Sequence, residues 1–181
     1  GSNVFFNGSC TITNESNHNW AFSSGAGSEN RIVSGTTTFG TDGMSTGGIT
    51  LMSSGDLVVR GNLVLQDGVD AGSGKLIFSG VGNKSYTGAL LEVETLTIGE
   101  NDSDPIERVE VNGTIRVNEL LDLNAGVLAT RSSGGSLIGD VIVGPNATIS
   151  ANNLTNTHVS GPLIREVSFA SPQTDVEINF P

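Results

Sequence analysis

The chain has 181 residues and a formal net charge of −11, with 19 acidic residues against eight Lys and Arg. This length suits one domain or one continuous repeat array. The few, scattered cations and the acid excess disfavour nucleic acid and anionic membrane surfaces as partners. No apolar run reaches the length of a transmembrane helix, and the lone Cys10 excludes an intrachain disulfide.

Short alternating apolar runs, separated by Gly, Asn and Asp, predict strands along the whole chain. No segment has a convincing helical period; the best candidate, 118–123, reads equally well as a strand. The predicted strands are 4–6, 10–13, 20–23, 31–33, 36–39, 49–52, 57–60, 63–66, 75–78, 85–86, 91–94, 95–98, 109–111, 115–117, 121–123, 127–129, 137–138, 141–143, 148–150, 158–159, 163–167 and 176–180.

An internal repeat carries the architectural interpretation. Residues 51–71 align without a gap on residues 109–129, so one constant offset relates every matched pair. The matched pairs include Gly55/Gly113, Val59/Val117, Leu63/Leu121, Leu65/Leu123, Gly68/Gly126, Val69/Val127 and Ala71/Ala129. Alternation directs these apolar side chains to one face and leaves the polar ones outside, as a core with a solvated exterior requires.

The fold class predicted from this pattern is all-β, a right-handed parallel β-solenoid with about nine short rungs of roughly 20 residues and no substantial helix. A β-sandwich would give similar strand spacing, but it does not need matching inward residues at a long fixed offset. Residues 1–47 are expected to form a cap or irregular rungs, 48–165 the repeat solenoid, and 166–181 a strand that leads to a further domain.

Several phrases resemble a known family. These are Phe6-Asn7-Gly8-Ser9, Val111-Asn112-Gly113-Thr114-Ile115, Leu121-Asp122-Leu123-Asn124-Ala125-Gly126-Val127 and His158-Val159-Ser160-Gly161-Pro162-Leu163. They are similar to the Gly/Thr/Asn-rich β-solenoid repeats of large secreted surface proteins in Bacteroidetes, described as adhesin-like or filamentous-haemagglutinin-like. The resemblance implies an extracellular location, calcium in some members, and roles in adhesion or display.

The densest acidic cluster contains Glu100, Asp102 and Asp104. Alternating oxygen ligands in a loop suit a hard cation such as calcium, although the spaced Gly and terminal Glu of an EF-hand are absent. The alternative is a solvated loop between rungs. No cofactor is required by the sequence, and calcium is the one that this loop would accommodate.

Trp20 and Tyr86 are the only Trp and Tyr of the chain. Such rings serve as stacking platforms for sugars, or they fill corners of a core. Threonine pairs such as Thr11/Thr13 and Thr36/Thr38 do not recur at one fixed offset, which argues against a flat threonine array. His18 and His158 lack the spacing of metal ligands.

The leading hypothesis is a non-catalytic structural or adhesive β-solenoid segment of a secreted bacterial cell-surface protein. Its partners would be the flanking domains of a longer chain, and glycans or another cell surface. A carbohydrate-binding or carbohydrate-cleaving β-helix is the alternative, since paired acids such as Asp102 and Asp104 are what glycoside cleavage uses. A calcium-stabilised stalk is a third interpretation.

Overall fold

A computed structural model describes residues 4–23, 31–41, 43, 47–53, 55–101, 103–152 and 157–168. Within these residues all regular secondary structure is β, and no helix is present. The strands are β1 (Val4–Phe6), β2 (Cys10–Asn14), β3 (Trp20–Ser23), β4 (Arg31–Val33), β5 (Thr36–Thr41), β6 (Ile49–Met52), β7 (Leu57–Val59), β8 (Asn62–Leu65), β9 (Val69–Gly72), β10 (Lys75–Phe78), β11 (Gly82–Ile98), β12 (Ile106–Leu123), β13 (Val127–Ala129), β14 (Asp140–Val143), β15 (Thr148–Ala151), β16 (His158–Ser160) and β17 (Leu163–Arg165).

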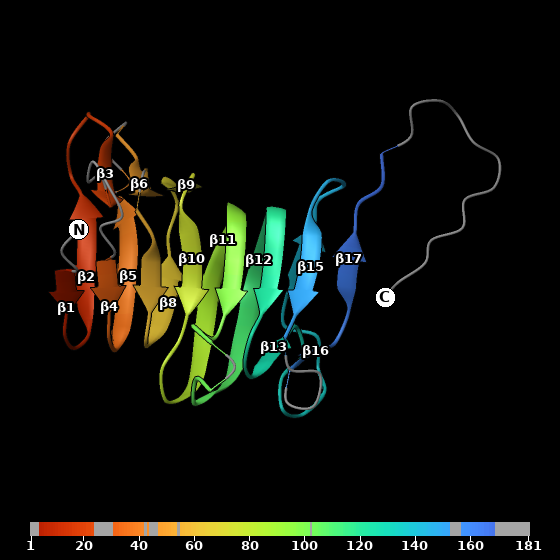
Figure 1. Ribbon diagram of the computed structural model, residues 1–181. Helices are drawn as coiled ribbons and strands as arrows, with labels where there is room; N and C mark the ends of the chain where they lie inside the picture. The colour runs from red at the N-terminus through yellow and green to blue at the C-terminus, as the bar shows by residue number, and fades with distance from the viewer. Residues whose placement is uncertain are drawn as a thin grey trace.

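The strands stack in parallel as a β-solenoid of about six turns (Figure 1). The strands line three sides of it, and we name these sides faces. Face 1 stacks β1, β4, β7, β10, the ends of β11 and β12, and β15. Face 2 stacks β2, β5, β8, the starts of β11 and β12, β13 and β16. Face 3 consists of two separate ladders, β3, β6 and β9 in one, and the middles of β11 and β12 with β14 and β17 in the other.

The turns differ in length. On face 1, Leu57 pairs with Leu76, whereas Leu121 pairs with Ile149, so the later turn takes up a longer stretch of chain. In place of the expected nine or so short rungs of roughly 20 residues, the solenoid therefore has about six turns of unequal length. At about 4.8 Å between stacked strands, the strands of face 1 from β1 to β15 span about 29 Å along the axis, shorter than the roughly 40 Å that nine rungs imply.

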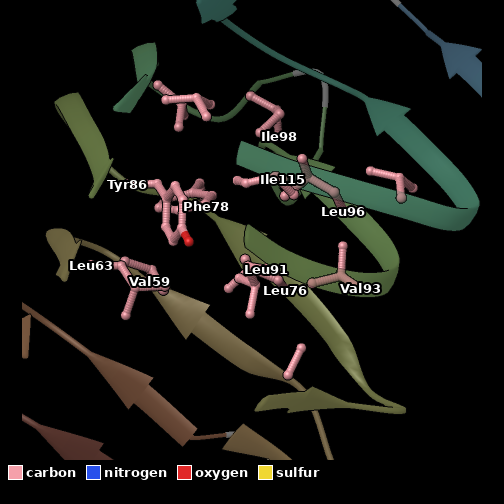
Figure 2. Packing of buried hydrophobic residues seen from close by; sticks show 14 of the residues in the cluster. Val59, Leu63, Leu76, Phe78, Tyr86, Leu91, Val93, Leu96, Ile98 and Ile115 are labelled. Carbon is pink, nitrogen blue, oxygen red and sulfur yellow. The ribbon is translucent and has the colours of Figure 1, made fainter. Parts of the chain in front are cut away.

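A single apolar core fills the interior from turn to turn. On face 1 the column Leu57, Leu76, Leu96 and Leu121 is fully buried. Figure 2 shows how residues of all three faces converge there, with the Tyr86 ring beside Phe78. Every second side chain of a strand points inward. When strands with the same alternation stack, the inward side chains at equivalent positions form one continuous buried column.

Glycines at the corners permit this close stacking. A Cβ at Gly61 would lie 1.8 Å from the carbonyl oxygen of Gly35 in the preceding turn. At Gly113, which has a φ of +147°, a Cβ would lie 1.9 Å from the carbonyl oxygen of Gly88. Only a residue without a side chain lets the backbones of successive turns approach this closely.

Most predicted strands are present, but those at 85–86, 91–94 and 95–98 form the single long strand β11, and those at 109–111, 115–117 and 121–123 form β12. The strand at 69–72 was not predicted, and 137–138 contributes only an isolated bridge from Leu137 to Arg131. The predicted strand at 176–180 lies outside the described residues. The ladders begin at β1, so the solenoid extends into the segment 1–47 that the sequence assigns to a cap or irregular rungs.

Candidate functional site

The outward side of face 2 carries two aligned columns of small, mostly polar residues. The first column is Ser9, Thr36, Asn62, Ser85 and Glu110, and the second is Thr11, Thr38, Val64, Thr87 and Asn112. We call these ten residues the polar track. With strands about 4.8 Å apart, the first column runs about 19 Å along the axis. No charged side chain belongs to the track before Glu110, although the chain carries a net charge of −11.

Hydrogen bonds link successive turns within the track. The Thr36 backbone N–H donates to the Ser9 hydroxyl at 3.2 Å. The Asn62 side-chain amide donates to the Thr36 hydroxyl at 3.4 Å, and its oxygen accepts from the Ser85 N–H at 3.0 Å. The side chains are therefore held in position, while a hydroxyl or amide group keeps further capacity to donate or accept toward a ligand that offers hydroxyl groups.

Two shallow hollows lie along the same surface. One, of about 300 Å³, is lined by Ser9, Cys10, Thr11, Thr36 and Thr38. The other, of about 380 Å³, is lined by Asn62, Asn83, Lys84, Ser85, Arg108, Glu110 and Ser133. Both are open and lined mainly by residues with polar side chains, which suits an extended ligand lying across the strands better than a small molecule that needs enclosure.

Lys84 forms part of the wall of the second hollow. The residue is 4% exposed, and its ammonium donates to the carbonyl oxygens of Val81 and Gly82. Burial lowers the pKa of Lys84, and the nearby Asp104 and Glu107 oppose that effect. Next to it, the Arg108 guanidinium pairs with Glu110 at 3.0 Å, so these two charges compensate each other.

A third hollow, of about 470 Å³, lies at the acidic loop between β11 and β12. Glu100 accepts from the Ser79 hydroxyl at 3.3 Å and faces the Arg60 guanidinium at 3.4 Å. The Asp104 carboxylate accepts three backbone N–H groups, from Gly80 at 2.9 Å, Glu100 at 3.0 Å and Ile106 at 3.1 Å. Asp104 therefore fixes the loop against the preceding turn.

The calcium expectation concerned this loop. Asp102 lies outside the described residues, so the expected set of three ligands is described only at Glu100 and Asp104. The part of the chain that the structure describes contains no group of three or more His, Cys, Asp or Glu side chains able to hold a metal ion. Calcium binding here stays a prediction, for which Asp104 would have to share oxygens that already accept hydrogen bonds.

The two candidate sugar-stacking rings have different positions. Tyr86 is fully buried on face 2, where its hydroxyl donates to the Ala89 carbonyl at 2.8 Å, and burial raises its pKa to about 12. A buried ring cannot stack on a sugar, so Tyr86 is a core residue. The backbone of Trp20 begins β3 and pairs with Ile49, while its side chain lies outside the described part of the chain.

Sequence reasoning missed the polar track because unequal turns hide the stacking. Along the second column, Thr11 lies beside Thr38, Thr38 beside Val64, and Val64 beside Thr87. Each of these three steps takes up a shorter stretch of chain than the one before it. A search at one fixed offset cannot align such positions, although a search for polar residues at outward strand positions would have found them.

The comparisons with known proteins give no relative. No family model matches the chain, no curated protein matches it, and no solved structure matches it. Among the described residues, no helix has the length and apolar character needed to cross a membrane.

Proposed function

We propose that this chain is a non-catalytic β-solenoid module of a secreted bacterial surface protein, wound right-handed, which displays face 2 as an adhesive surface. The observation that carries the proposal is the polar track, a mostly uncharged and ordered row of hydroxyl and amide groups on an acidic protein. The apolar core runs through every turn and leaves the outer faces for recognition.

The ligand class that fits best is a neutral glycan chain. Its hydroxyl groups both donate and accept, as the Ser, Thr and Asn side chains of the track do. A linear polymer could contact several turns together, which multiplies weak contacts without an enclosed pocket. The resemblance to adhesin-like surface repeats supports the same class of partner, and flanking domains of a longer chain would place the module at the cell surface.

A glycan-array screen with a matched pair of variants tests the proposal. Thr38→Lys puts a long cation in the centre of the track, whereas Thr50→Lys makes the same change on the outward side of face 3. Binding by the unchanged chain that is lost with Thr38→Lys and kept with Thr50→Lys supports the adhesive role of face 2. Equal loss in both variants, or no selective binding by a folded chain, contradicts it.

Calcium stabilisation is a separate proposal about the loop that contains Glu100 and Asp104. If calcium holds this loop, chelator lowers the melting temperature, and added calcium restores it. An unchanged melting temperature in chelator contradicts the calcium proposal and leaves the adhesive surface on face 2 unaffected.

A further inference from the structure

The corner that follows β13 departs from the rest of the solenoid. Residues 131–137 form a short hairpin, closed by an antiparallel bridge between its first and last residues, whereas every ladder between the described strands is parallel. Inside it, the Ser132 N–H donates to the Ser136 carbonyl at 2.8 Å, and the Arg131 guanidinium donates to the Gly135 carbonyl at 2.7 Å. We call residues 131–137 the wall hairpin.

The wall hairpin lies where the polar track ends. The Arg108 guanidinium, at the last turn of the track, donates to the carbonyl oxygen of Arg131. Ser133, at the turn of the hairpin, lines the same hollow as Glu110. In the following turn the first column of the track continues with Ala129, which is fully buried although it occupies an outward position. A ligand that lies along the track therefore meets a wall after Glu110.

The hollow beside the wall hairpin contains polar groups that the protein does not use. In the part of the chain that the structure describes, the Asn83 side-chain amide and the Ser85 and Ser133 hydroxyls have no hydrogen-bond partner. Glu110 accepts from the Arg108 Nε–H at 3.0 Å through one carboxylate oxygen, and its other oxygen accepts from no described residue. Donors and acceptors for a ligand therefore converge at this hollow.

The charges around the hollow favour a neutral ligand over an acidic one. The Lys84 ammonium is held by two backbone carbonyls, and the carboxylates of Asp104 and Glu107 lie close enough to stabilise its positive charge. The Arg108 guanidinium is paired with Glu110. Both cations that line the hollow thus have carboxylates nearby, which disfavours a further carboxylate. A guanidinium donor beside a carboxylate acceptor instead matches two neighbouring hydroxyl groups of a sugar.

We propose that, given the adhesive role proposed for face 2, this hollow binds the sugar at the non-reducing end of the glycan chain. A glycosidic linkage consumes one hydroxyl, so the terminal sugar has one more free hydroxyl than an internal sugar has. A site built to hydrogen-bond that group discriminates against a sugar that lacks it. The wall hairpin keeps the chain from continuing past Glu110, and the rest of the glycan lies back along the track toward Thr38.

The test compares a matched pair of carboxylate variants. Glu110→Gln removes the acceptor charge at the hollow, whereas Glu92→Gln makes the same change on face 3, where Glu92 pairs with Arg116 at 3.5 Å. The probes are linear, neutral malto-, xylo- and manno-oligosaccharides, each in short and long forms. Titration calorimetry gives the affinity and the number of protein molecules bound per glycan chain, and cooperative thermal unfolding verifies the fold of each variant.

At least one series should bind with one protein molecule per glycan chain whatever its length, because each chain has a single non-reducing end. Glu110→Gln should weaken this binding about tenfold, as expected for loss of a hydrogen bond to a charged group, and Glu92→Gln should leave it unchanged. Reduction of the opposite, aldehyde end of the glycan should have no effect.

Three results would overturn this assignment. They are several protein molecules on one long chain, equal affinity of Glu110→Gln and the unchanged protein, and no binding of any of the three series. If glycan binding is still lost with Thr38→Lys and kept with Thr50→Lys on the array, the adhesive role of face 2 stands even though the hollow does not bind the chain end.

Discussion

Replacing Tyr86 with Phe tests whether this ring belongs to the core. The hydroxyl of Tyr86 donates to the Ala89 carbonyl at 2.8 Å, and burial raises the pKa of the phenol from 10 to about 12. Phe keeps the packing of the ring and removes both the hydrogen bond and the ionisable group. The change should therefore lower stability at neutral pH and raise it at high pH, relative to the unchanged chain.

The magnitudes follow from the two effects. Loss of the hydrogen bond should cost about 1 kcal/mol at neutral pH. Because the pKa is higher in the folded state, the phenol's contribution to stability is complete below pH 10 and is lost as pH rises toward 12. Two pKa units correspond to about 2.7 kcal/mol, of which roughly 2 kcal/mol is lost by pH 12. Plotted against pH, the free energies of unfolding of the two proteins should cross at about pH 11.

Urea unfolding of both proteins over a pH series measures the crossing. Lys84, whose pKa burial lowers, titrates in both proteins, so its effect cancels in the difference. Tyr86 is the only tyrosine, so the near-ultraviolet absorbance of its phenolate reports its pKa directly. A phenolate that forms at pH 10 in the folded chain, or a stability difference that does not change with pH, would refute the burial of this ring.

Three further predictions concern stability, each measured by urea unfolding. Leu96→Ala should cost about 2–5 kcal/mol because Leu96 is fully buried, whereas Leu90→Ala, at a 53% exposed position of the same strand, should change stability by less than about 0.5 kcal/mol; similar costs would contradict the placement of the core. Gly61→Ala should destabilise strongly because its Cβ meets the Gly35 carbonyl, whereas Gly134→Ala has no neighbour closer than 3.8 Å and should be nearly neutral; equal effects would argue against close stacking at that corner. Glu166→Gln removes the ion pair with Arg116, whose hydrogen bond to Glu166 raises the pKa of the guanidinium; the loss of stability should shrink in high salt, and a loss independent of salt would rule out a mainly electrostatic role.

The strands could be predicted from the sequence because alternation has a strong physical cause. Leu57 and Val59 must point inward on face 1, and Leu63 and Leu65 on face 2, so each apolar pattern marks a strand whatever face it joins. The exception, β9, contains Asp70 and Gly72, which are typical turn residues. It is a strand because β6 lies beside it and pairs with it, which no local pattern reveals.

The sequence could not predict which strand stacks on which, because strands on all three faces need the same alternation of inward apolar side chains. The internal repeat matches Val59 on face 1 with Val117 on face 3, and Leu63 on face 2 with Leu121 on face 1. The offset between the two copies of the repeat is therefore not a whole number of turns. The repeat instead marks a unit of two strands joined by a corner, and this unit occurs on every face. The polar track was hidden because its columns depend on which strands are neighbours, and the unequal turns conceal those neighbours from a search at one fixed offset.

Unequal turns also indicate where the outer surface of the solenoid can vary. The core constrains the strands, so extra residues accumulate at corners, where they need not pack inward. The turn from Leu96 to Leu121 takes up more of the chain than the preceding one, from Leu76 to Leu96. The longer turn contains the loop of Glu100 and Asp104, which lines one hollow. The turn after it contains Ser133, at the edge of the hollow beside Lys84. The outer surface of this fold can therefore change through corner insertions while the buried columns stay the same.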